Sequence, residues 1–274
     1  MPFPHYLCSL EPVQRYFIEI AYNGTAYHGW QIQKNALSVQ ELINKVLSTL
    51  CRQDVETLGC GRTDTGVHAR QLFAHADIPG KIDVLNPQFL LSMNSMLPYD
   101  IVVKRFIKVA SDAHARFDAT LRSYEYHIHF SKDPFLHNLS WLLRDKPGIE
   151  LMNEAAAILM EYRDFSCFSK SNTKTLTNNC LIQKAEWVQT EHGIAFYISA
   201  DRFLRNMVRA IVGTLIKVGK MEMNVEDIRM VIDSKNRSVA GESVPACGLY
   251  LTEVIYPYLT HNQPTNQQLI TQNP

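Results

Sequence analysis

The segment GCGRTDTGVHA, residues 59–69, places one carboxylate and one guanidinium inside a glycine-rich run. Asp64 follows Arg62 at a spacing of two. Glycines at this density are typical of a tight, exposed loop whose backbone approaches a ligand closely. A single carboxylate in such a loop can act as a nucleophile or a general base. The alternative is a surface turn in which Arg62 and Asp64 form an exposed ion pair.

The letters Asp64-Thr65-Gly66 also match the signature that carries the catalytic carboxylate of aspartic proteases. Those enzymes need two aspartates that share one proton, because two carboxylates so close together cannot both be ionised. The signature occurs once in this chain, after Gly-Arg-Thr instead of an apolar strand. A neighbouring guanidinium also opposes proton sharing. The pattern therefore favours one ionised catalytic carboxylate over a protease.

A basic stretch late in the chain offers a partner for this carboxylate. Residues 202–219, RFLRNMVRAIVGTLIKVG, have apolar side chains at helical spacing, which predicts one long helix. On that helix Arg205 and Arg209 would lie one turn apart on the same face. Arg209 has apolar neighbours on both sides, so we expect it to be partly buried, and a buried arginine needs an anionic partner. Asp64 is the candidate, and this pairing would keep its carboxylate ionised at neutral pH.

Positive charge gathers in three stretches, although 27 Lys and Arg residues balance 27 Asp and Glu in the whole chain. They are residues 104–116, the loop FSKSNTKTLTNN at 168–179, and residues 202–220. Each stretch alone is typical of a solvated surface. Three in a neutral chain favour a polyanionic partner, held through its phosphates.

An aromatic strand offers a further contact. The segment SYEYHIHF, residues 123–130, alternates as a half-buried strand does. Tyr124, near its start, could stack on a nucleobase. The same alternation is typical of aromatic side chains packed in a core, so both interpretations stay open at this point.

Helix and strand patterns run through the whole chain. Strands are predicted near residues 15–24, 71–78, 101–110, 123–130 and 247–257, with a hairpin over 184–200; helices are predicted near 38–50, 86–97, 151–162, 202–219 and 225–233. This predicts an α+β fold in which two related halves form a largely antiparallel sheet flanked by helices, with the catalytic cleft between the halves. The expected parts are residues 1–111, residues 112–259 and a flexible polar tail, residues 260–274.

Composition sets further bounds. Of 274 residues, 46% are apolar and 20% charged, which is typical of a soluble globular protein. No apolar run is long enough to cross a bilayer and the start does not resemble a secretory signal, so we expect a cytoplasmic protein with no membrane partner. The six cysteines lack metal-ligand spacing and are expected to be reduced thiols, with no metal site.

Five longer blocks occur in order: YNGTAYHGWQIQ, GCGRTDTGVHA, AHARFDATLRSYEYHI, RFLRNMVRAIVGTLIKVG and AGESVPACGLYL. Together they resemble the tRNA pseudouridine synthase A family. The resemblance implies an isomerase that converts uridine to pseudouridine in the anticodon stem-loop of tRNA, at tRNA positions 38, 39 and 40. It also implies a homodimer that grips each tRNA with both subunits, and neither a metal nor a cofactor.

The resemblance also implies residue roles. Asp64 matches the essential aspartate and Arg209 the arginine that pairs with it, while Arg62 matches a base-flipping arginine and Tyr124 a tyrosine that stacks on the flipped uracil. We expect RNA contacts at Ala113, His114, Ala115, Arg116, Phe117, Lys132, Asn172, Thr173, Lys174, Thr175, Leu176 and Arg205.

Four positions depart from the family pattern: Cys60 and Thr65 replace alanines, Asn23 an aspartate and Cys247 a histidine. None of the four is assigned to chemistry. The competing hypothesis is a non-catalytic RNA-binding module of the same fold. The presence of all four residues with an implied role in the reaction argues against it: Asp64, Arg62, Tyr124 and Arg209.

Overall fold

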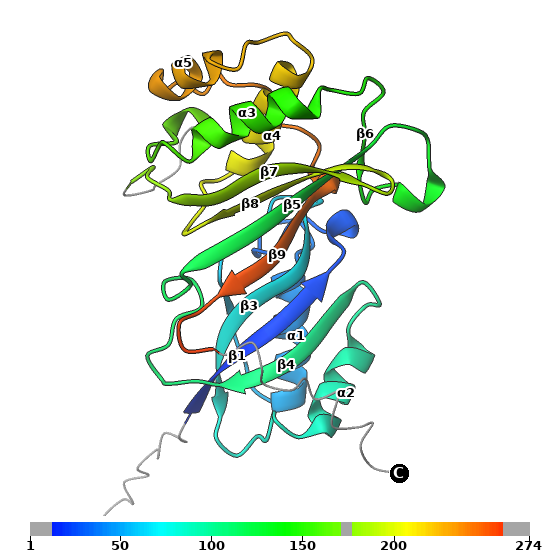
Figure 1. Ribbon diagram of the computed structural model, residues 1–274. Coiled ribbons are helices and arrows are strands. Elements are labelled where there is room, and N and C mark those ends of the chain that lie inside the picture. Colours follow the sequence, from blue (N-terminus) through cyan, green and yellow to red (C-terminus); the bar gives the residue numbers. More distant parts are fainter. Residues whose placement is uncertain (1–12, 171–176, 260–274) are drawn as a thin grey trace, which may run out of the picture.

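The structure is a computed structural model that describes residues 13–170 and 177–259. One mixed, mostly antiparallel sheet of nine strands runs the length of the molecule, flanked by five helices (Figure 1). The strands are β1 (Val13–Tyr22), β2 (Leu58–Gly59), β3 (His68–Pro79), β4 (Ile101–Lys108), β5 (Leu121–His129), β6 (Trp141–Leu142), β7 (Ile182–Thr190), β8 (Gly193–Ala200) and β9 (Leu249–Ile255). The predicted α+β class is confirmed.

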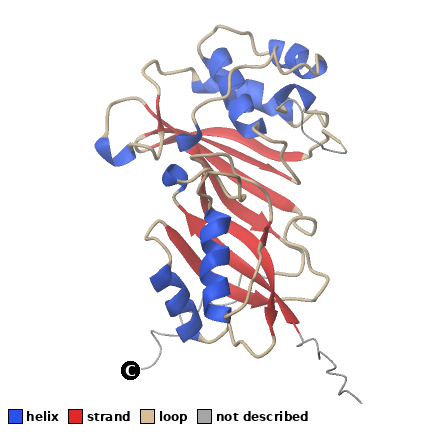
Figure 2. Ribbon diagram, turned by 180° about the vertical axis from the view of Figure 1, so that it is seen from behind, coloured by secondary structure: helices blue, strands red, loops and turns tan. Residues whose placement is uncertain are grey.

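The helices gather at the two ends of the sheet (Figures 1 and 2). They are α1 (Val39–Cys51), α2 (Pro87–Met96), α3 (Ile149–Leu159), α4 (Met207–Gly219) and α5 (Asp227–Asp233). Helix α1 begins where the sequence predicts, because the Ser38 hydroxyl accepts a hydrogen bond from the Glu41 amide at 3.3 Å. Helix α2 uses Asn86 as its N-cap in the same way.

The strand order β4-β1-β3-β9-β5-β8-β7 brings the last strand of the chain into the middle of the sheet. There β9 pairs with β3 in parallel through His68 and Ala69, whereas it pairs with β5 antiparallel. Two large hydrophobic clusters lie at either side of this join, one around β1, α1 and α2, the other around α3, α4 and β8. The predicted division at residues 111 and 112 stays a prediction, and the tail at 260–274 lies outside the described residues.

One helix starts later than predicted. The pattern at 202–219 predicts a single helix, but α4 begins at Met207. Asn206 adopts a left-handed backbone conformation with φ 66°, which asparagine tolerates better than most residues, and its side chain donates to the Ser243 hydroxyl. The prediction that Arg205 and Arg209 lie on one helical face is therefore wrong, because Arg205 precedes the helix.

The described residues contain no helix long and apolar enough to cross a membrane. Five of the six cysteines are described, and all five are free thiols. Cys51, Cys60, Cys167 and Cys180 are buried.

Candidate active site

Asp64 lies beside the pairing of β3 with β9, which separates the two hydrophobic clusters. The loop of residues 59–66, here called the Asp64 loop, connects β2 to β3. From α4, the Arg209 Nη1 lies 3.5 Å from Asp64 Oδ2. The Arg205 Nε lies 3.8 Å from Asp64 Oδ1. The carboxylate, 28% exposed, thus lies between two guanidinium groups and remains open to solvent.

The two arginines differ in how firmly they are held. Arg209, in the first turn of α4, is 20% exposed, and its Nε donates to the Val244 carbonyl at 2.7 Å. Its pairing with Asp64 agrees with the expectation from the sequence. Arg205 is 59% exposed and lies just before the helix. Arg209 is therefore the fixed partner of Asp64, and Arg205 is free to reach outward as well.

Buried hydrogen bonds fix the backbone beside Asp64. The buried Thr63 hydroxyl lies 2.8 Å from the Tyr22 hydroxyl and accepts a hydrogen bond from the Trp30 amide at 3.1 Å. The Cys60 amide donates to the Phe73 carbonyl of β3 at 2.7 Å. Neither Thr63 nor Tyr22 was predicted as a site residue from the sequence; the available signal was a hydroxyl next to the candidate catalytic carboxylate.

Several glycines in and around the Asp64 loop allow either a positive φ or a close contact with another part of the chain. Gly29 and Gly66 have φ values of 85° and 77°, and a Cβ on Gly29 would lie 2.2 Å from the Thr63 carbonyl oxygen. A Cβ on Gly59 would lie 2.4 Å from Trp30 Nε1. A Cβ on Gly61 would meet no atom within 4 Å. Close approach at Gly29 and Gly59 is thus between parts of the chain itself, and only Gly61 faces open space.

Tyr124 lies on β5 at the same join. Its ring packs edge-on against Phe203 at 5.1 Å, and it contacts both hydrophobic clusters. Burial raises the pKa of its phenol, so the hydroxyl keeps its proton at neutral pH. Arg62, in contrast, is exposed, and the ion pairs among the described residues do not join it to Asp64. The alternative of an exposed ion pair between Arg62 and Asp64 is therefore not what the structure shows, and the Arg62 side chain extends into solvent.

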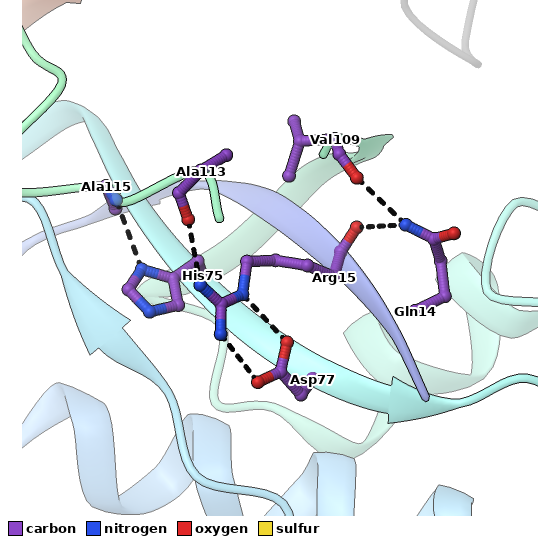
Figure 3. A network of polar contacts seen from close by, with 7 residues as sticks. All are labelled: Gln14, Arg15, His75, Asp77, Val109, Ala113 and Ala115. Carbon is purple, nitrogen blue, oxygen red and sulfur yellow. Dashed lines mark hydrogen bonds and ion pairs between the residues drawn. The ribbon is translucent and has the colours of Figure 1, made fainter. Parts of the chain in front are cut away.

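The backbone of residues 113–117 is held by a polar network of side chains from β1 and β3 (Figure 3). Arg15 donates to both Asp77 oxygens at 2.8 and 2.7 Å and to the Ala113 carbonyl at 3.1 Å. The Ala115 amide donates to His75 Nδ1 at 3.1 Å. Burial, the Arg15 charge and His114 lower the pKa of His75 to about 4, which keeps the ring neutral and able to accept this hydrogen bond.

The anchoring leaves only part of this segment available to a ligand. The side chains of Ala113 and Ala115 are buried, whereas Arg116 and Phe117 are exposed and His114 is half-buried. The Arg116 guanidinium lies 5.8 Å from the centre of the Phe117 ring. RNA contacts here stay a prediction, and the two alanines fit a supporting role better than direct contact.

Two further predicted RNA contacts are Lys132 and the segment Asn172–Leu176. Lys132 is exposed and follows the far end of β5, so the structure does not bring it beside Tyr124, from which the strand alone extends about 16 Å to His129. The segment Asn172–Leu176 lies outside the described residues. Within 13–170 and 177–259, no group of three or more His, Cys, Asp or Glu side chains is arranged to hold a metal ion.

Comparisons with known proteins agree on one family. A family model described as tRNA pseudouridine synthase matches residues 155–257. A protein named tRNA pseudouridine synthase A from Porphyromonas gingivalis is 50% identical over 246 residues, 89% of this chain and 97% of the relative. A relative with the same name from Bacteroides thetaiotaomicron is 48% identical over 94% of this chain and 97% of its own length. Another from Clostridium acetobutylicum is 36% identical over 87% of this chain and 98% of its own length.

Proposed function

The chain belongs to the tRNA pseudouridine synthase A family and is an isomerase that makes pseudouridine in tRNA; on that premise we propose that Asp64 is its catalytic carboxylate. The observation that supports this role is the position of Asp64, which is open to solvent yet paired with Arg209 at the join of the two halves. Its neighbours are two guanidinium groups, whereas a protease carboxylate would have a second carboxylate beside it.

The reaction breaks the bond between uracil N1 and ribose C1′ and forms a bond between C5 and C1′. The C5 proton leaves and N1 gains a proton, so the composition of the nucleotide does not change. An ionised Asp64 can attack C1′ or C6 as a nucleophile, or remove a ribose proton as a base. All three routes require the negative charge that Arg209 and Arg205 stabilise.

The target base must leave its stack to reach Asp64, at a cost of about a few kcal/mol. Arg62 is exposed on the Asp64 loop, only two residues from Asp64, and in this proposal it fills the vacated space and holds phosphate. Tyr124, already packed edge-on against Phe203, stacks on the flipped uracil. The substrate uridines are those of the anticodon stem-loop.

The RNA path in this proposal runs over Arg205, the exposed side chains Arg116 and Phe117, Lys132, and the loop at residues 172–176. The active form is a cytoplasmic homodimer, so that basic side chains from two neutral chains contact one tRNA. Salt should therefore weaken tRNA binding steeply.

The test uses tRNA labelled with tritium at uridine C5, because the reaction releases that hydrogen. We expect release by the wild type and none by Asp64→Asn, with tRNA affinity kept. Asp54→Asn removes an exposed carboxylate of the same type outside the site and should retain full release. Full release by Asp64→Asn would overturn the assignment, and a wild type that binds tRNA without any release would indicate a non-catalytic RNA-binding module.

A further inference from the structure

Arg122 on β5 donates hydrogen bonds to four backbone carbonyls from separate parts of the chain. Its Nη1 reaches Ala119 at 2.9 Å and Asp201 at 2.7 Å. Its Nη2 reaches Cys60 at 3.1 Å and Arg116 at 2.6 Å. One side chain therefore connects the Asp64 loop, the segment at 113–117 and the stretch that leads to Arg205.

These partners are unusual for a half-buried cation. Among the described residues no ion pair joins Arg122 to a carboxylate, so four carbonyl dipoles compensate its charge. Only a guanidinium suits this arrangement, because its donors form a rigid planar fork, whereas a lysine ammonium is a compact point charge. The charge also lies near the site: burial raises the pKa of Tyr124 and of Cys60, and Arg122 acts against both shifts.

The three connected segments have separate roles in the proposed function. Cys60 belongs to the loop that carries Asp64, and Arg116 belongs to the segment expected to contact RNA. Asp201 directly follows β8 and begins the stretch that leads to Arg205, the second cation at Asp64. A shift of the Arg116 backbone would therefore be transmitted through one guanidinium to the backbone four residues before Asp64.

We propose that Arg122 is a positioning residue for the isomerisation, which aligns the Asp64 loop with the RNA-facing segment so that bound RNA presents its flipped uridine to Asp64. This inference rests on the proposed role of Asp64. It assigns Arg122 no contact with the reacting atoms; its effect acts entirely through the backbone that it holds.

The test is Arg122→Lys, which keeps the charge and removes the fork. Under single-turnover conditions with saturating enzyme, we expect the rate constant for tritium release to fall about 100-fold, the loss typical of an ångström-scale misplacement. A purely structural role would lower the folded fraction, and so the amplitude of release, while the rate constant stayed unchanged. Arg229→Lys is the matched control: Arg229 bonds to Glu161 and Glu226 on the distant α5 surface, and its variant should retain the wild-type rate constant.

Arg122→Gln serves as a second variant if lysine lowers the folded fraction, because its neutral amide avoids burying an ammonium. It should show the same loss of rate. A wild-type rate constant in either folded variant would overturn the inference. Absence of release by the wild type would instead overturn the proposed function itself, so the two failures can be told apart.

Discussion

The Asp64 loop and the segment at 113–117 are both short loops beside the same sheet, but they differ in how firmly their candidate functional side chains are held. Around Asp64, the buried Thr63 hydroxyl and the crowded Gly29 fix the backbone, and Arg209 fixes the side chain. At 113–117 the backbone is anchored and the His114 ring packs against His75, whereas the side chains of Arg116 and Phe117 are exposed. A catalytic carboxylate must be held in a fixed position, whereas contacts to a flexible polyanion need exposed side chains that can extend to its phosphates.

Among the variants that test this division of roles, Arg209→Met is expected to have the largest effect. Removing a partly buried partner leaves the Asp64 charge to the exposed Arg205, so we expect tritium release at saturating enzyme to fall about 100-fold. Lys217→Met removes a cation from the last turn of the same helix and should leave the rate unchanged. Equal losses in both variants would mean that the helix charge as a whole matters, and not the pair.

Gly29→Ala should destabilise the Asp64 loop. Its Cβ would lie 2.2 Å from the Thr63 carbonyl oxygen at a φ of 85°, so we expect about 2 kcal/mol less unfolding free energy, measured by urea denaturation. Gly61→Ala is the control, since its Cβ would meet no atom within 4 Å. Similar unfolding free energies for the two variants would show that the backbone around Gly29 shifts to accommodate a Cβ at little cost.

The anchor below 113–117 should respond to pH through His75. Its folded-state pKa of about 4 lies below the ordinary histidine value, so the unfolded chain binds the proton more readily. The stability that a neutral His75 provides is therefore complete above pH about 6.5 and is lost as the pH falls toward 4.

His75→Asn keeps an acceptor for the Ala115 amide and removes the titration. Relative to this variant, the wild type should lose up to about 2 kcal/mol of unfolding free energy between pH 7 and pH 5. Parallel pH profiles for the two proteins would contradict the burial of a neutral His75.

The smallest effect is expected from Arg15→Met. It releases the Ala113 carbonyl, whereas Arg122 still holds the carbonyls of Arg116 and Cys60. We therefore expect tRNA affinity to fall about tenfold or less while the saturated rate is kept. Filter binding and single-turnover release measure the two quantities. A slower saturated rate with normal affinity would break the proposed division.

Local sequence patterns predicted much of the fold because the helices and strands have strong periodicity. The cap at Ser38 and the hairpin through β7 and β8 are examples. The pairing of Asp64 with Arg209 was predicted from charge and burial alone. The start of α4 was missed because the apolar spacing continues through residues 202–206, while the left-handed turn at Asn206 depends on its tertiary partner Ser243.

The supporting residues could not be predicted for a similar reason. In the sequence Arg122 is one more basic residue, just before the strand predicted at 123–130. Its proposed role depends on four carbonyls up to 79 positions away. Thr63 bonds to Tyr22, 41 positions away. The Thr63–Tyr22 contact forms within the first part of the chain, whereas the bond from Arg122 to Cys60 forms only when β9 brings β5 beside β3. Short motifs carry no information about either contact.

The division between a fixed loop and a reaching segment is tested most directly by measuring the single-turnover release rate and tRNA affinity of two variants, Thr63→Val and Arg116→Ala. Thr63→Val leaves the Tyr22 hydroxyl and Trp30 amide without their partner, so the rate should fall about tenfold or more with affinity kept. Arg116→Ala should weaken binding, reduce the slope of log affinity against log salt by about one, and keep the saturated rate. Loss of affinity alone in Thr63→Val, or loss of saturated rate alone in Arg116→Ala, would contradict the account.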